Sequence, residues 1–169
     1  MMASLDVRYA GFGLWRTSHA TWGVSDDAGR LAEILKELAE FFLQPAIAHK
    51  RFNQPIYSLI DLYNECSKAN WDGEEALPVR EEAISEACTI LFLLPTNVPV
   101  PTFLAEPSGA VAFEWYKDRG KTLILSVKGT RSIEYAALLG EGNEAHGKAN
   151  YSGSLPKIIR DQLEAFAVL

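Results

Sequence analysis

The chain has 169 residues, of which 48% are hydrophobic and 22% are charged, values typical of a single folded domain. This composition excludes disorder over the whole chain. The net charge of -6 at pH 7 also excludes a generally basic protein that follows nucleic-acid phosphates.

The N-terminal segment combines a stretch without clear periodicity and one predicted helix. Alternation from Leu5 to Tyr9 allows a short strand. Ser25-Asp26-Asp27 is typical of a helix start, and the apolar residues after it recur at helical spacing. This apolar stripe consists of Leu31, Ile34, Leu35, Leu38 and Phe42. Pro45 is expected to bend or end the helix.

Two more helices are predicted before residue 95. Gln54-Pro55 indicates the start of the first, whose apolar stripe includes Leu59 and Tyr63. The composition of Asn70 to Gly73 is that of a turn. Pro78 is expected as the first residue of the next helix. That helix should end at Pro95, ahead of a proline-rich extended linker.

From residue 102 the apolar period changes from about 3.6 residues to about 2. Short alternating runs separated by glycine-containing turns are typical of an antiparallel meander. The expected strands are 102–105, 110–117, 121–128, 131–139 and an edge strand at 146–151. Ser152 to Pro156 should then cap a last helix, with Ile159, Leu163 and Phe166 on its core stripe.

This order of elements predicts one α+β domain over residues 1–169. About four helices should pack on one face of a four- to five-stranded antiparallel meander sheet. Residues 1–100 form the mainly helical half, and residues 101–169 form the sheet and the C-terminal helix.

The lack of a recognisable targeting signal and the cysteine usage favour a cytoplasmic protein without a membrane partner. Asp6 and Arg8 interrupt any secretory signal. The most apolar run, Ile90 to Leu94, is far shorter than the roughly 20 residues of a membrane span. Cys66 and Cys88 form no C-x-x-C pair, and we expect both to be buried free thiols.

The entire net charge falls within residues 55–100, where Lys68 and Arg80 stand against eight acidic residues. Such an acidic surface favours encounter with a basic protein, and tryptophan is enriched at the centres of protein interfaces. The predicted partner-binding residues are Trp71, Asp72, Glu74, Glu75, Glu81 and Glu82. Alternatively, the acids lie on a solvated loop and at a helix N-terminus that favours them, and Trp71 covers the edge of the core. Trp15 and Trp22 are similar candidates for an interface.

No catalytic residue, metal site or cofactor is predicted, because the chain has no G-x-S-x-G or H-E-x-x-H motif. One alternative is a small enzyme or nuclease with a site at Glu141, Glu144 and His146. Another is a nucleic-acid binder that uses the basic hairpins of the sheet near Trp115 and Tyr116. The basic residues of these hairpins are Lys117, Arg119, Lys121, Lys128 and Arg131. Direct nucleic-acid binding is the less favoured alternative, since charged residues are usual at hairpin turns.

The last hundred residues carry a series of short motifs. They are Trp71-Asp72-Gly73, Ala76-Leu77-Pro78, Leu94-Pro95, Pro99-Val100-Pro101, Glu106-Pro107-x-Gly109, Glu114-Trp115, Ile133-x-Tyr135, His146-Gly147 and Leu155-Pro156. In these motifs the chain resembles a family of small bacterial proteins with no established activity. The resemblance implies one half of a two-gene module. We therefore expect a non-enzymatic antitoxin, immunity protein or anti-defence inhibitor. It would neutralise a basic partner such as a toxin or a nucleic-acid-processing protein. The sequence also allows a homodimer in which two subunits pair through an edge strand.

Overall fold

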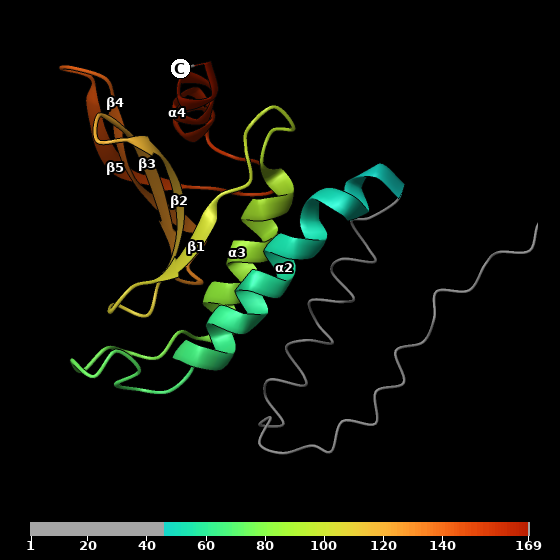
Figure 1. Ribbon diagram of the computed structural model, residues 1–169, viewed down its shortest axis with the longest axis vertical. Coiled ribbons are helices and arrows are strands. Elements are labelled where there is room, and N and C mark those ends of the chain that lie inside the picture. The colour runs from blue at the N-terminus through green and yellow to red at the C-terminus, as the bar shows by residue number, and fades with distance from the viewer. Residues whose placement is uncertain (1–45, 169) are drawn as a thin grey trace, which may run out of the picture.

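The computed structural model describes residues 46–168, with side chains from residue 51 onward. The described elements are α2 (Ala46–Cys66), α3 (Glu81–Leu93), β1 (Thr102–Ala105), β2 (Val111–Asp118), β3 (Lys121–Val127), β4 (Ser132–Leu139), β5 (Glu144–Asn150) and α4 (Lys157–Val168). The strands form one antiparallel sheet in the order β1-β2-β3-β4-β5. The three helices lie on the same side of that sheet (Figure 1). The predicted α+β class and the antiparallel meander are confirmed.

The helix count differs from the prediction of about four, because the described residues form three. The predicted strand at Leu5 to Tyr9, the predicted helix before Pro45, and Trp15 and Trp22 all lie outside the described residues. The predicted helix start at Gln54-Pro55 is wrong, since α2 runs through Pro55 without a break. A proline inside a helix removes one backbone hydrogen bond. The buried stripe of Phe52, Ile56 and Leu59 continues across it, and this packing offsets the lost bond.

Helix α3 begins at Glu81 rather than at the predicted Pro78. The residues before it are held extended by two long-range backbone bonds. The Leu77 N–H donates to the Pro107 carbonyl at 2.9 Å, and the Val79 N–H donates to the Cys66 carbonyl at 2.9 Å. These bonds direct the amides away from a helical turn, so tertiary contacts override the preference of proline for a first helical position.

One face of the sheet builds the core with the three helices. Phe113 pairs with Leu125 across β2 and β3, and Leu125 pairs with Tyr135 across β3 and β4. Phe113 and Leu125 are fully buried. From α4, the predicted residues Ile159, Leu163 and Phe166 are buried against the same core. The alternation in the sequence therefore assigned the core face correctly.

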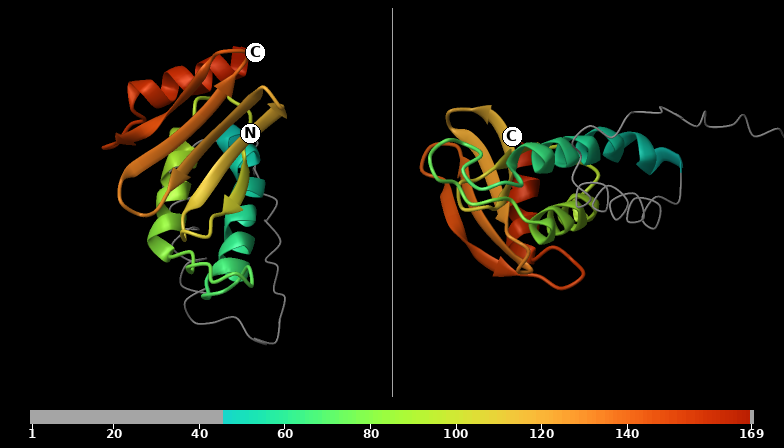
Figure 2. Two further views of the ribbon diagram at one scale, coloured as in Figure 1. Left: turned by 90° about the vertical axis from the view of Figure 1, so that its left-hand side faces the viewer. Right: turned by 90° about the horizontal axis from the view of Figure 1, so that it is seen from below.

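The opposite face of the sheet is not covered by any described element. Figure 2, left, shows this face toward the viewer with α2 and α3 behind the strands. It carries the exposed side chains of Leu104 and Tyr116 and an exposed ion pair across β4 and β5. In that pair the Lys148 Nζ lies 2.9 Å from a Glu134 oxygen, a surface contact that contributes little to stability.

The proline-rich linker between α3 and β1 is held by side chains from two other elements. The Arg51 Nη2 donates to the carbonyls of Pro95 at 2.9 Å and Val98 at 2.7 Å. The buried Trp115 donates its indole N–H to the Pro99 carbonyl at 2.7 Å. The linker thus gains hydrogen-bond donors for carbonyls that no neighbouring strand satisfies.

Both cysteines are free and buried, which confirms the prediction from their spacing. Among the described helices, none combines the length and the apolar character that a membrane span requires.

We expect the free energy of unfolding to fall above about pH 9. Burial raises the pKa of the Cys88 thiol from 9.0 to about 12. The unfolded thiol therefore ionises before the folded one, so the stability is full below the unfolded pKa and is lost as the pH rises toward the folded pKa. At pH 10 the loss from this thiol is about 1 kcal/mol. Urea unfolding at pH 8 and pH 10 measures it.

Cys88→Ala should remove that part of the pH dependence. Cys66→Ala is the matched control, because Cys66 is 7% exposed whereas Cys88 is 1% exposed. Removal of the Cys66 thiol should therefore change the dependence of the unfolding free energy on pH less than removal of the Cys88 thiol. Identical pH slopes for the parent protein and Cys88→Ala would show that the buried thiol does not control alkaline stability.

Candidate functional site

Five of the six predicted partner-binding residues are acidic, and they lie where α2 ends and α3 begins. We call this surface the acidic end and define it by Asp72, Glu74, Glu75, Glu81 and Glu82. The first three lie in the loop between α2 and α3, and the last two form the first turn of α3. Figure 1 shows this loop beside the turn between β1 and β2, to which the Leu77 N–H is bonded.

The loop of the acidic end is held by its own hydrogen bonds. An Asp72 oxygen accepts the N–H of Glu74 at 2.8 Å and of Ala76 at 3.1 Å. The Asn70 side-chain oxygen accepts the Glu75 N–H at 2.9 Å. Asn70 and Glu75 adopt left-handed backbone conformations, with φ of 61° and 68°, that few non-glycine residues take. The loop therefore presents Glu74 and Glu75 in a fixed geometry, and Asp72 serves to shape the loop.

Trp71 is half-buried and packs against the hydrophobic core. Its indole N–H donates to the Leu77 carbonyl at 3.0 Å, which satisfies its one polar group within the loop. These contacts match the alternative in which Trp71 covers the edge of the core. In the chain, Trp71 directly precedes Asp72 of the acidic end.

The acids of the acidic end have no ion-pair partners among the described side chains, whose two ion pairs are Lys148 with Glu134 and Lys157 with Asp161. Glu74, Glu75 and Glu82 are exposed, and Glu81 is half-buried. Glu81 and Glu82 also interact favourably with the dipole of α3, as the alternative interpretation predicts. The dipole explains these two positions, but it does not explain Glu74 and Glu75.

Beside the acidic end lies an open cleft of about 570 Å³. It is bounded by one side of α3, the turn between β3 and β4, and the segment between β5 and α4. Its lining residues are Glu81, Glu82, Ser85, Glu86, Thr89, Gly129, Arg131, Tyr151, Ser152 and Gly153. Three carboxylates against one guanidinium give the cleft a net negative charge.

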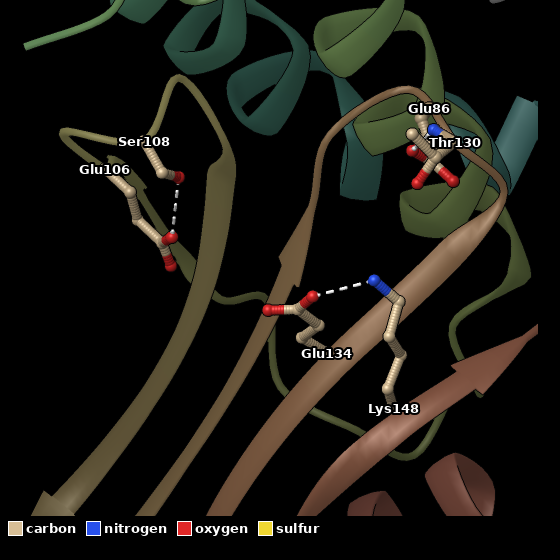
Figure 3. Close-up of polar contacts among 6 residues, drawn as sticks. All are labelled: Glu86, Glu106, Ser108, Thr130, Glu134 and Lys148. Carbon is tan, nitrogen blue, oxygen red and sulfur yellow. Dashed lines mark hydrogen bonds and ion pairs between the residues drawn. The ribbon is translucent and has the colours of Figure 1, made fainter.

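Glu86 is the one buried residue among those that line the cleft, with 6% of its surface exposed. Figure 3 shows its carboxylate beside Thr130 in the turn between β3 and β4. One carboxylate oxygen, Oε2, accepts the N–H of Gly129 in a short bond and the N–H of Thr130 at 3.0 Å. The other, Oε1, is buried without a hydrogen-bond partner of normal geometry among the described residues.

Sequence reasoning missed Glu86 as a site residue. A signal for it exists, since Ala83, Glu86 and Ile90 recur at the helical spacing of a buried stripe. An acid on such a stripe needs hydrogen-bond partners. Those partners are backbone amides 43 and 44 residues away, which only the folded chain brings close.

Tyr151 and Arg131 complete the walls of the cleft. Burial, the charge of the Glu86 carboxylate and a side-chain hydrogen bond to it raise the pKa of Tyr151 well above its ordinary value, and Arg131 acts in the opposite direction. The Tyr151 hydroxyl therefore lies against the Glu86 carboxylate. Arg131 has a left-handed backbone with φ of 56° and an exposed side chain.

The three residues of the predicted enzyme site do not all line the same hollow in the structure. Glu144 and His146 lie on β5 and line a shallow hollow of about 290 Å³ on the uncovered face of the sheet, whereas Glu141 is not among its lining residues. Among the side chains that the structure describes, those of residues 51–168, no three His, Cys, Asp or Glu gather in a way that could hold a metal ion.

The basic hairpin residues do not form one continuous surface. Lys121 begins β3 and pairs with the end of β2, whereas Lys128 and Arg131 follow the other end of β3. Trp115 is buried with 3% of its surface exposed, so its ring is not available for stacking with bases. Tyr116 is exposed on the uncovered face. The burial of Trp115 and the separation of Lys121 from Lys128 and Arg131 give this alternative less support than the acidic end has.

Comparisons with protein-family models, with curated proteins and with solved structures find no match to this chain. The candidate functions therefore rest on its own residues.

Proposed function

We propose that this protein is a non-enzymatic binding module that neutralises a basic protein partner through its acidic end. The observation that carries the proposal is the fixed presentation of acids without ion-pair partners at one end of the described domain. Exposed like charges repel one another and contribute no packing. Their gathering on an ordered loop is therefore better explained by recognition than by stability.

The mechanism is electrostatic attraction followed by steric coverage of the partner. A concentrated negative surface accelerates encounter with a positive one and fixes its orientation. The ordered loop requires little rearrangement on binding, which lowers the entropy that association removes. Lys68 and Arg80 are also exposed in this region, so their positive charges should face acidic groups of the partner and select its orientation.

A partner that is itself a nucleic-acid-processing protein suits this surface. Such a protein carries a basic surface for phosphates, and an acidic protein bound there would exclude its substrate. The same mechanism describes antitoxins, immunity proteins and anti-defence inhibitors, which are the functional classes that we propose for this chain.

Charge reversal at the acidic end should weaken partner binding about tenfold or more, because it replaces attraction by repulsion at encounter. The variant carries Glu74→Lys, Glu75→Lys, Glu81→Lys and Glu82→Lys. Tagged protein recovers the partner from host lysate at about 20 mM and about 200 mM salt, since screening differs strongly between these conditions. The affinity of the purified pair, and the activity of the partner in its presence, are then measured.

A matched control reverses the same number of charges elsewhere on the domain. It carries Glu114→Lys, Glu141→Lys, Glu144→Lys and Glu164→Lys, none of which belongs to the acidic end or lines its cleft. This control should bind as the parent does, or nearly so. Equal affinity for the parent and the acidic-end variant, or the absence of any salt-sensitive partner, would contradict the proposed function.

A further inference from the structure

We infer that two copies of this protein form a homodimer in which their β5 strands pair antiparallel, centred on His146. The inference goes beyond the proposed function, because no residue of the acidic end lies on β5. The sequence allows such pairing at either edge of the meander, whereas the structure favours one edge and one register.

The two edges of the sheet differ in how well they can accept a further strand. Strand β1 has only four residues and follows Pro101, which has no backbone N–H to donate. Short strands and prolines are common devices that protect a sheet edge. Strand β5 has seven residues without a proline, and it pairs with β4 without a break in register. The β5 edge is therefore the one suited to pairing.

The hydrogen bonds at the two ends of the β4–β5 ladder show which backbone groups of β5 face the open edge. The Leu139 N–H donates to the Asn143 carbonyl at 2.9 Å, and the Tyr151 N–H donates to the Arg131 carbonyl at 3.1 Å. Hydrogen-bonded and non-hydrogen-bonded pairs alternate along antiparallel strands, so the odd-numbered residues of β5 bond to β4. The N–H and carbonyl groups of the even-numbered residues point to the open edge, where no described backbone group bonds them. These residues are Glu144, His146, Lys148 and Asn150.

The charges of the even-numbered residues select the register. Glu144 and Lys148 lie two positions on either side of His146. A symmetric antiparallel pair centred on His146 sets Glu144 of each copy opposite Lys148 of the other, and directly opposed unlike charges attract. Centring the pair on Glu144 or on Lys148 would instead oppose like charges. The His146 register also joins the open N–H and carbonyl groups of the two strands to one another.

The Lys148 side chain does not guard the open edge. A lysine on an edge strand commonly opposes further pairing, but the Lys148 Nζ lies 2.9 Å from a Glu134 oxygen on β4 (Figure 3). The side chain therefore turns back over the sheet. Because an ammonium group has three donors, Glu144 of the second copy can bind the same ammonium from the other side. Charges would then alternate along the row of Glu134, Lys148 and the second copy's Glu144.

The helix side of β5 leaves room for a second strand. Its residues Ala145, Gly147 and Ala149 are small, and α4 packs on β3 and β4. A Cβ atom at Gly147 would lie 3.0 Å from the Tyr135 hydroxyl oxygen, so the Tyr135 ring covers this glycine. Aromatic cover of this kind stabilises a glycine in an edge strand. Strand β5 is therefore ordered before a second copy binds.

The first test is sedimentation velocity of the full chain from about 1 μM to about 1 mM, a range that detects weak and moderate dimers. We expect a concentration-dependent shift from monomer to dimer. Glu144→Lys opposes two lysines and Lys148→Glu opposes two glutamates, so each variant alone should dimerise about tenfold more weakly or less. An equimolar mixture of the two variants opposes unlike charges again. The mixed dimer should therefore be about tenfold tighter than the dimer of either variant alone.

The matched controls are Glu65→Lys and Lys68→Glu, which make the same charge changes at exposed positions outside the sheet. Each control should dimerise within about twofold of the parent, because an isolated surface charge contributes little. Mixing the two controls should not tighten the dimer, which separates opposed charges at β5 from a general attraction between unlike net charges. Urea unfolding of each variant confirms that it is folded.

Amide hydrogen exchange then locates the interface by alternate residues. The N–H groups of His146 and Lys148 should exchange more slowly at about 1 mM protein than at about 50 μM, because only the dimer bonds them. The N–H groups of Ala145 and Ala149 bond to β4 in each copy, so their exchange should depend little on concentration. Glu144→Lys should remove the concentration dependence at His146.

Three results would overturn the inference. They are a monomer at every concentration, a mixture of the two β5 variants that dimerises no better than either alone, and exchange at His146 that does not depend on concentration. A dimer that neither β5 variant weakens would place the contact on another surface, such as the uncovered face of the sheet, and would also overturn it. The proposed function fails separately, since each copy keeps its own acidic end and a monomeric variant should still bind the basic partner.

Discussion

Gly129→Ala should lower the free energy of unfolding by about 3 kcal/mol, because it combines two unfavourable effects. Gly129 adopts φ of +81°, and a Cβ atom there would lie 2.5 Å from the Glu82 Cβ and 2.9 Å from the Glu82 carbonyl carbon. Relief of this contact would require the turn between β3 and β4 to move away from α3. That movement would also lengthen the bond from the Gly129 N–H to Glu86.

The matched control is Gly73→Ala. Gly73 has nearly the same backbone conformation, with φ of +79°, but no heavy atom lies within 4 Å of its added Cβ. The free energy of unfolding of this variant should therefore fall by only roughly 1 kcal/mol, which is the cost of an alanine in a left-handed backbone conformation. Chemical denaturation of both variants measures the difference. Equal losses would mean that the turn moves freely away from α3.

Glu86→Ala should lower the free energy of unfolding by about 2–3 kcal/mol. It removes the acceptor of two backbone N–H groups, those of Gly129 and Thr130, and opens space beneath them. An unsatisfied buried donor is destabilising by about 1–3 kcal/mol, although the adjoining cleft admits water that lowers this loss. Amide hydrogen exchange at the two residues should accelerate in parallel.

Two control variants test whether the loss of stability in Glu86→Ala is specific to the buried carboxylate. Glu86→Gln keeps an acceptor oxygen, so its loss should stay below about 1.5 kcal/mol. Glu65→Ala replaces an exposed helical glutamate and should change stability by less than about 0.5 kcal/mol. A Glu86→Ala variant as stable as Glu65→Ala would show that the buried carboxylate does not hold the turn.

The double variant of Glu86→Ala and Gly129→Ala should lose less than the sum of the single losses, because both changes loosen the same contact between α3 and the turn. The effect on the cleft follows from the same coupling. The turn forms one wall of the cleft, so a mobile turn should also change the shape of that wall.

The sequence by itself determined the order of the described elements and the face that β2, β3 and β4 bury. Alternation with a period of about 2 assigned Phe113, Leu125 and Ile133 to the core, where they are fully buried. This inference works because neighbouring residues on a strand point to opposite faces. The concentration of charge in residues 55–100 likewise located the acidic end, since its acids are close in the chain.

Only the tertiary structure decided features that depend on contacts between distant residues. Pro55 and Pro78 misled the sequence-based prediction, because packing on α2 and long-range bonds at Leu77 and Val79 outweighed local preference. Nor could the cleft be predicted, since its carboxylate at Glu86 and its amides at Gly129 and Thr130 are more than 40 residues apart. Local periodicity carries no information about which distant backbone groups will satisfy a buried charge, and that pairing creates this candidate site.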